Sequence, residues 1–160
     1  MKIFVLSLSV FMGCNAFAQT HQLIQHDGIV QDINFIKQDQ NLVFYSNPES
    51  QEQKTISIHA VAALKELKSF ENQIISSKNQ INSKDDYYKV VVLEDQTQVT
   101  GLKVGEEFKG QLNIMKGISV WEQWENTKRA VKYRAAEKGY PFVTITKKSH
   151  GKYVATAYTY

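Results

Sequence analysis

The chain has 160 residues, of which 42% are hydrophobic and 22% charged, with 19 Lys and Arg against 16 Asp and Glu. This length holds one domain or two small ones, and the composition is that of an ordinary globular protein. Mean hydropathy is −0.36, and beyond residue 18 no apolar run is long enough to span a bilayer, which excludes a helical membrane protein.

The first 18 residues have the features of a secretory signal peptide. Met1-Lys2 supplies a positive start, residues 3–12 form an apolar run broken only by serines, and Ala16-Phe17-Ala18 provides an A-x-A cleavage site. We therefore expect removal of residues 1–18, a mature chain that starts at Gln19, and a periplasmic or secreted location in a Gram-negative envelope.

The only cysteine, Cys14, lies within this signal, so the mature chain has neither disulfides nor thiol chemistry. An alternative remains open, because Gly13-Cys14 has the small residue that precedes a lipidated cysteine. Phe11 stands where such signals usually carry leucine, which favours cleavage near Ala18 over lipidation.

Charge is distributed unevenly along the mature chain. Residues 19–107 hold 8 Lys and 13 Asp or Glu, a net of −5, whereas residues 108–160 hold 10 Lys or Arg and 3 Glu, a net of +7. Either the basic half binds an anionic partner, or the two halves complement each other, or the cations simply solvate a helix face.

The acidic segment 19–107 is predicted to contain one helix among strands. A polar arm precedes a hairpin, and apolar residues spaced by three and four then indicate a helix that Ser57 caps. The expected order is a loose arm at 19–27, strands at 28–36 and 42–45, a helix over 57–76, and strands at 88–93 and 98–104.

The basic segment 108–160 has the clearest signals. Ser119 and Glu122 fit a capping box at the start of a helix, and Gly139 with Pro141 ends it. Alternating residues predict a strand over 111–119 before the helix, and a hairpin of strands 142–146 and 153–160 after it.

The predicted fold class is α+β, with an antiparallel sheet and helices packed on one face. Residues 19–107 would form a ββαββ segment and residues 108–160 a βαββ domain. Apart from the extra strand at the front, both units would be strand–helix–strand–strand, which makes an internal duplication one interpretation.

The C-terminal residues suggest a family. Ala136-x-Lys138-Gly139, Ile145-Thr146 and Thr156-Ala157-x-x-Tyr160 occur in that order, and residues 111–160 resemble the YdgH/BhsA/McbA-like family of small exported proteins. The chain departs from the family pattern at Tyr140-Pro141 and at Ala155. The resemblance implies a non-enzymatic α+β protein of the envelope stress and biofilm type, without catalytic residues.

No motif in the sequence predicts catalysis, a cofactor or a phosphate loop, and the four histidines are scattered. Cations crowd the second helix and the turn that follows it, which makes them candidates for binding an anionic envelope component or a protein partner: Lys128, Arg129, Lys132, Arg134, Lys147, Lys148 and Lys152. A weaker candidate is a copper(II) site formed by Gln19, Thr20 and His21 at the mature N-terminus.

The expected function is therefore a non-enzymatic exported envelope protein that acts by binding, with no nucleic-acid partner. The alternative is a periplasmic inhibitor or immunity protein that blocks a toxin or a lysozyme.

Overall fold

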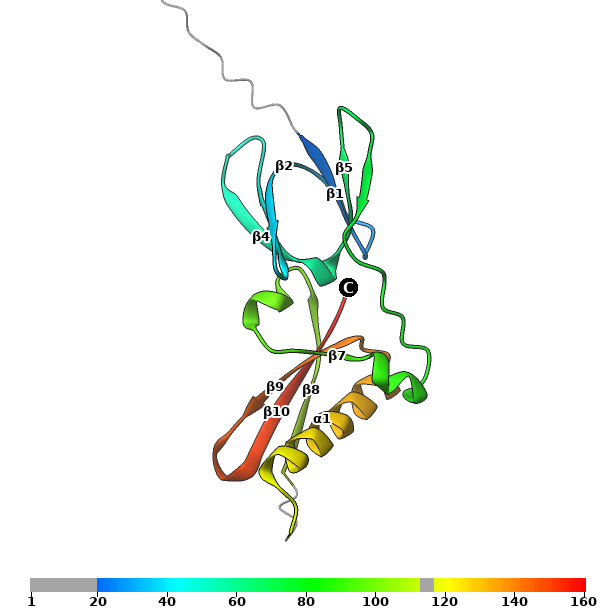
Figure 1. Ribbon diagram of the computed structural model, residues 1–160, viewed down its shortest axis with the longest axis vertical. Helices are drawn as coiled ribbons and strands as arrows, with labels where there is room; N and C mark the ends of the chain where they lie inside the picture. The colour runs from blue at the N-terminus through cyan, green and yellow to red at the C-terminus, as the bar shows by residue number, and fades with distance from the viewer. Residues whose placement is uncertain (1–19, 113–116) are drawn as a thin grey trace, which may run out of the picture.

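The computed structural model describes residues 20–112 and 117–160, which form two sheets arranged one above the other in Figure 1. The expected signal peptide, and residues 113–116 of the expected strand 111–119, lie outside the described residues.

The first sheet has six antiparallel strands in the order β4-β3-β2-β1-β5-β6. A short 3-10 turn, η1 (Ile58–Ala60), leads from β4 into β5, which returns to pair with β1. The sheet curls into an open ring in Figure 1, which we call the barrel. Its strands are β1 (His21–Gln25), β2 (Val30–Asp39), β3 (Leu42–Ser46), β4 (Gln53–Ser57), β5 (Val61–Glu66) and β6 (Asn72–Ile74).

A register shift in β2 produces the curl. The first part of β2 pairs with β1 and the second with β3, and the shift falls between Phe35 and Lys37. Such a bulge bends a strand and increases its twist, so one strand serves both walls of the barrel. Each of the first five strands then turns apolar side chains into a common core, whose members are at most 3% exposed: Leu23, Ile33, Val43, Ile56, Ala60, Val61 and Leu64.

Two predictions for this half were wrong, and they share one cause. The expected helix over 57–76 is the turn η1 followed by β5 and β6, and the expected loose arm is β1. β5 pairs with β1 on one side and with β6 on the other. Its alanines and leucine suit a helix locally, but pairing with two strands outweighs that propensity.

The second sheet has four strands in the order β7-β9-β10-β8, with one helix on one face. β7 runs parallel to β9, whereas the other pairs are antiparallel. Its elements are β7 (Val91–Leu93), β8 (Lys103–Gln111), α1 (Val120–Glu137), β9 (Phe142–Lys147) and β10 (Lys152–Thr159), with 3-10 turns η2 (Lys84–Lys89), η3 (Gln96–Val99) and η4 (Ser149–Gly151).

Helix α1 and the hairpin β9–β10 are confirmed, although only the serine half of the expected capping box is present among the described contacts. The Ser119 hydroxyl accepts from the Glu122 amide at 3.2 Å, and Gly139 at φ 77° closes the helix. The buried stripe of α1 is formed by Thr127, Val131, Ala135 and Ala136. It packs on Val143 of β9 and on alanines of β10 that are fully buried, which lets the helix approach the sheet closely.

Other expectations for this region need correction. Strand β8 crosses the expected boundary at 107/108, and most of the expected strand 98–104 is the turn η3 and the start of β8. The expected strand 88–93 is shortened because Tyr88 and Lys89 belong to η2. The α+β class is confirmed, but residues 20–107 contain no α-helix, so the first unit is not strand–helix–strand–strand.

The two sheets meet where the chain passes from η3 into β8. The Ser57 amide donates to the Thr100 carbonyl at 2.9 Å, and the Lys103 ammonium lies 3.0 Å from the Asp27 carboxylate. Leu102 packs against the barrel core and also against a small cluster on the face of the second sheet opposite α1, formed by Leu93, Phe142 and Tyr158. The contacts between the halves are thus made by buried apolar groups as well as by polar ones.

Gly101 provides a test of this junction. It has φ +86°, and a Cβ atom there would lie 2.6 Å from Ile56 Cγ1 and 3.2 Å from Ala60 Cβ. Gly28 has a similar φ of +93° but would place its Cβ in open space. Gly28→Ala should cost only the backbone strain, about 1 kcal/mol, whereas Gly101→Ala should cost about 2–4 kcal/mol because overpacking adds to the strain.

Urea unfolding of the two variants measures this difference directly. Equal losses of stability would mean that the close approach at Gly101 contributes nothing beyond backbone strain, contrary to the packing described.

Candidate functional site

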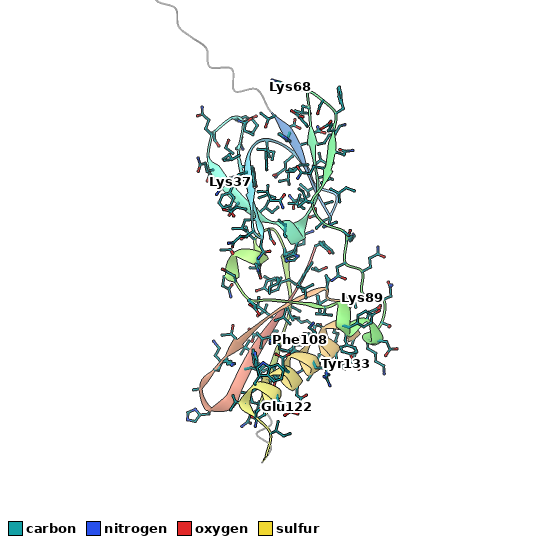
Figure 2. All side chains as sticks on the ribbon, in the orientation of Figure 1. Lys37, Lys68, Lys89, Phe108, Glu122 and Tyr133 are labelled. Atoms are coloured by element: carbon teal, nitrogen blue, oxygen red, sulfur yellow. The ribbon has the colours of Figure 1, made fainter. Side chains whose placement is uncertain are left out.

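A groove runs between α1 and the segment that precedes β7. Its walls are formed by η2 and β7 on one side and by one flank of α1 on the other, and they border an open hollow of about 500 Å³. Figure 2 shows the side chains of this region, with Lys89 at η2 and Tyr133 on the helix. We call this groove the α1 groove. It is lined by Tyr87, Tyr88, Val92, Glu125, Lys128, Arg129 and Lys132.

Aromatic stacking fixes η2 against the helix. The Tyr87 ring stacks on the Tyr133 ring with centroids 3.9 Å apart and planes 16° apart. Asp86 and Lys89 form an ion pair at 2.6 Å, and the Asn79 side-chain Nδ2 donates to the Lys89 carbonyl at 2.9 Å. The next residue, Val90, is buried in the core beneath α1. This wall of the groove is therefore already formed in the free protein.

The groove carries an excess of positive charge. The Lys128 ammonium pairs with the Glu125 carboxylate at 2.9 Å, three residues earlier on the helix. Arg129 and Lys132 have no ion-pair partner among the described residues. Three cations thus line the groove with a single carboxylate, and two tyrosine rings lie beside them.

A second hollow of about 240 Å³ continues from the α1 groove and shares Val92 and Lys128 with it. Trp124 lines it from the helix, and Thr144, Ile145 and Thr146 line it from β9. The Lys147 ammonium lies 4.2 Å from the Trp124 ring centroid and the Lys128 ammonium 5.8 Å, so both make cation–π contacts.

The structure divides the seven predicted cations among four places. Lys128, Arg129 and Lys132 line the α1 groove, and Lys147 lies at the adjoining hollow. Arg134 is on the opposite flank of the helix, where its guanidinium lies 5.0 Å from the Phe108 ring and donates to the Lys109 carbonyl. Lys148 and Lys152 are exposed at the β9–β10 hairpin.

Charge complementarity between the halves does not account for these cations. Of the seven, only Lys128 has an ion pair within residues 20–112 and 117–160, and its partner is on the same helix. In the same ranges, the ion pair that joins the two sheets is Lys103 with Asp27, which uses none of the seven. The basic helix flank therefore faces solvent without acidic neighbours from the barrel.

Sequence reasoning missed the tyrosines of the groove. Tyr88 was expected to begin the strand 88–93, and Tyr87 belonged to no predicted element. Their contribution depends on η2 docking against α1, more than thirty residues further along the chain. The adjacent pair of aromatic residues was the only local signal.

The predicted copper site is not preformed. Gln19 lies outside the described residues, and the Thr20 amide donates to the Ile33 carbonyl at 3.1 Å as part of the barrel. Copper at this motif needs that amide deprotonated and free. The His21 ring packs on Phe35 instead, and among the described residues no three His, Cys, Asp or Glu side chains are grouped so that they could hold a metal ion.

A histidine and a serine come together at the junction, but their geometry is structural. His26 Nε2 lies 2.8 Å from Ser76 Oγ, and that hydroxyl donates its proton to the Val61 carbonyl at 2.8 Å. Since a hydroxyl has one proton, the imidazole must donate to Ser76 rather than accept from it. A general base would require the opposite arrangement.

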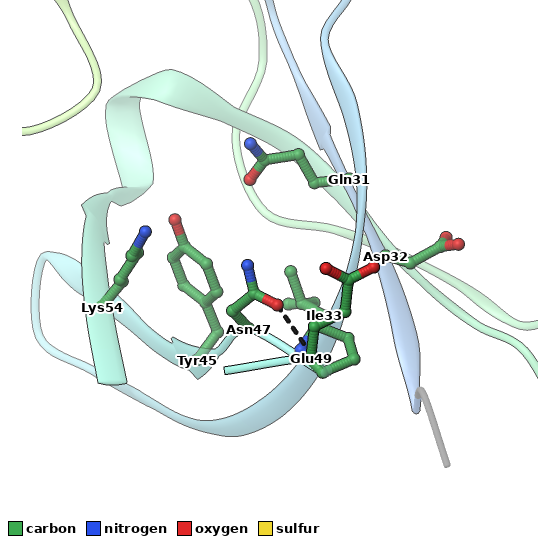
Figure 3. A pocket seen from close by; sticks show the side chains of 8 residues that line it. Gln31, Asp32, Ile33, Tyr45, Asn47, Glu49 and Lys54 are labelled. Atoms are coloured by element: carbon green, nitrogen blue, oxygen red, sulfur yellow. Dashed lines mark hydrogen bonds between the residues drawn. The ribbon is translucent and has the colours of Figure 1, made fainter. Parts of the chain in front are cut away.

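The barrel has a cleft of its own, shown in Figure 3, with a volume of about 360 Å³. Tyr45 and Lys54 line it together with the carboxylates of Asp32 and Glu49. The Asn47 side chain accepts from the Glu49 amide at 2.8 Å, which closes the local turn. Its charges are mixed and its amide serves the loop itself, so the α1 groove is the stronger candidate site.

Comparisons with known proteins give no relatives: no family model, no curated protein and no solved structure matches the chain. Within the described part of the chain, no helix combines the length and apolar character needed to cross a membrane.

Two half-buried histidines at the junction make stability depend on pH. Burial lowers the pKa of both His26 and His59 from 6.5, and Lys78 lowers the pKa of His26 further. His59 packs on Phe142 and His26 on Tyr160, so both favour the neutral imidazole in the folded state. The unfolded chain then binds more protons, and stability should be fully present above pH 6.5 and fall below it.

Urea unfolding between pH 8 and pH 5 should show this fall, and a His26→Gln, His59→Gln variant should have a flatter profile. Asp27 and Asp86 do not interfere, because their pKa values are lowered from 3.8 and lie below this range. A variant whose profile parallels that of the parent would show that other groups titrate.

Proposed function

We propose that this protein is an exported, non-enzymatic binding protein of the cell envelope that holds an anionic envelope component in the α1 groove. The observation that carries the proposal is the presence of Arg129 and Lys132, without ion-pair partners among the described residues, beside Tyr87 and Tyr88 in a preformed cavity.

Electrostatics supports an anionic ligand. Lys128 and Lys132 stand four residues apart on the helix and Arg129 lies between them, and like charges at such spacing destabilise a helix. Lys128 is partly covered, with 26% of its side chain exposed, and has Glu125 to offset it. A bound phosphate or carboxylate would remove the remaining repulsion and form charge-assisted hydrogen bonds with the arginine and lysine donors.

The form of the site suits a ligand of moderate size. Its volume of about 500 Å³ is within the range of sites for small molecules and head groups, roughly 300–1,000 Å³. Tyr88, whose side chain is 64% exposed, offers an apolar ring and a hydroxyl beside the cations. Such a combination can hold both the charged and the uncharged parts of one ligand.

The sequence supports the location. The signal-like features of residues 1–18 favour export, and the resemblance of residues 111–160 to exported stress and biofilm proteins favours an envelope function without catalysis. Gly139, one of the residues on which the resemblance rests, ends α1, and Thr156 and Ala157 lie in β10.

Charge reversal in the groove tests the proposal. Binding of the purified protein to phosphorylated lipopolysaccharide is measured by isothermal titration calorimetry. Arg129→Glu with Lys132→Glu should weaken binding at least tenfold, since each charge-assisted hydrogen bond contributes about 1.5–3 kcal/mol. Dephosphorylated lipopolysaccharide should bind the parent weakly.

Lys148→Glu with Lys152→Glu is the matched control, because it changes the net charge equally at the exposed hairpin outside the groove. It should bind almost as well as the parent. Equal losses in both variants would show that net charge rather than the groove governs binding, and a parent protein that binds no phosphorylated lipopolysaccharide would refute the proposal.

A further inference from the structure

The α1 groove is one part of a longer cationic surface. It shares Val92 and Lys128 with the hollow beside β9, so the two cavities are continuous along one flank of the helix. Trp124, Lys128 and Lys132 are spaced by four residues and therefore form one row on that flank. The row has cations at both ends, from Lys147 beside Trp124 to Lys132 with Arg129.

The Trp124 end brings two ammonium groups to one ring. Lys147 comes from β9 and Lys128 from the helix, and both lie within 6 Å of the Trp124 ring centroid. Lys128 is offset by Glu125, whereas Lys147 has no ion-pair partner among the residues that the structure describes. Glu94 lines the same hollow from the chain after β7. The Lys147 ammonium, which lies against the indole, is therefore the cation at this end that an anion would contact.

The other end is chemically distinct. Arg129 presents a planar fork of donors, and Lys132 adds a point charge beside Tyr87 and Tyr88. Since a helix rises 1.5 Å per residue, Trp124 and Lys132 are about 12 Å apart along its axis. A single phosphate is too small to contact both ends.

We infer that the surface has two anion-binding subsites, one at Arg129 and Lys132 and one at Lys147 and Trp124, and that its ligand is a saccharide head group of an envelope glycolipid carrying two phosphates that lie too far apart to share one subsite. Lys128 lies between the two subsites and would contact the sugar that links the two phosphates. This inference rests on the proposed function and adds to it the number and spacing of the ligand's charges.

The spacing favours a compact diphosphorylated head group over a flexible acidic chain. The backbones of the two subsites belong to a helix and a strand, which restricts the separation of the subsites before binding. A ligand whose two charges match that separation gains the second contact without a second loss of translational freedom. The tyrosine rings and Val92 lie along the groove wall, where the uncharged sugar ring would pack.

The test compares diphosphoryl lipid A with monophosphoryl lipid A in identical detergent micelles, using the full purified chain. The parent protein should bind the diphosphoryl form at least about tenfold more tightly, because the second phosphate binds as part of the same molecule. Lys132→Gln and Lys147→Gln should each remove most of this preference, by deleting one subsite each. Lys148→Gln, adjacent to Lys147 but in the exposed hairpin, should retain it.

Other outcomes would overturn the inference. Equal affinity of the parent for both lipids would show that the protein binds only one phosphate of the ligand. Full competition by inorganic pyrophosphate, whose two phosphates are directly joined, would show the same. A Lys147→Gln variant that keeps the preference would remove the second subsite while leaving the proposed function intact. Failure of the parent to bind either lipid would refute both proposals.

Discussion

The close approach of residues 100–102 to the end of β4 is the constraint on which the arrangement of the two halves depends. Gly101 lies against Ile56 and Ala60, where a side chain has no room, and its positive φ turns the chain toward β8. On one side of it Thr100 accepts from Ser57, and on the other Leu102 enters both hydrophobic clusters. The start of β8, and through it the sheet that supports α1, is therefore fixed relative to the barrel.

Prediction from sequence succeeded where an element carries its own boundaries. Helix α1 has a serine cap and a glycine stop, and the hairpin β9–β10 alternates clearly, so local chemistry alone located them. It failed for β5, because Ala63 and Leu64 fit a helical stripe as well as a strand. β5 is a strand because it pairs with β1, which lies about 40 residues earlier in the chain and is composed mainly of polar residues. Missing β1 and misassigning β5 were thus the same error.

The candidate site shows the same division between local and distant information. The cations of the groove were visible because helical spacing places Lys128 and Lys132 on one flank. Arg134 was grouped with them although six residues from Lys128 take it around the helix to Phe108. The tyrosines could not be found, since Tyr87 becomes part of a site only by stacking on Tyr133. The sequence allowed us to predict which residues share one helix, but it did not allow us to predict contacts between separate elements.

Strand β10 has a consequence for how the chain acquires its structure. It lies between β8 and β9, so its two neighbours in the sheet are synthesised before it and have no common partner until it arrives. In the first sheet, by contrast, every pairing except that of β1 with β5 joins strands that are consecutive in the sequence, so most of that sheet can form as it appears. During synthesis the four-stranded sheet therefore cannot be completed until β10 has emerged. The second sheet is therefore completed late because its strand order places β10, the last of its strands in the sequence, between two earlier ones.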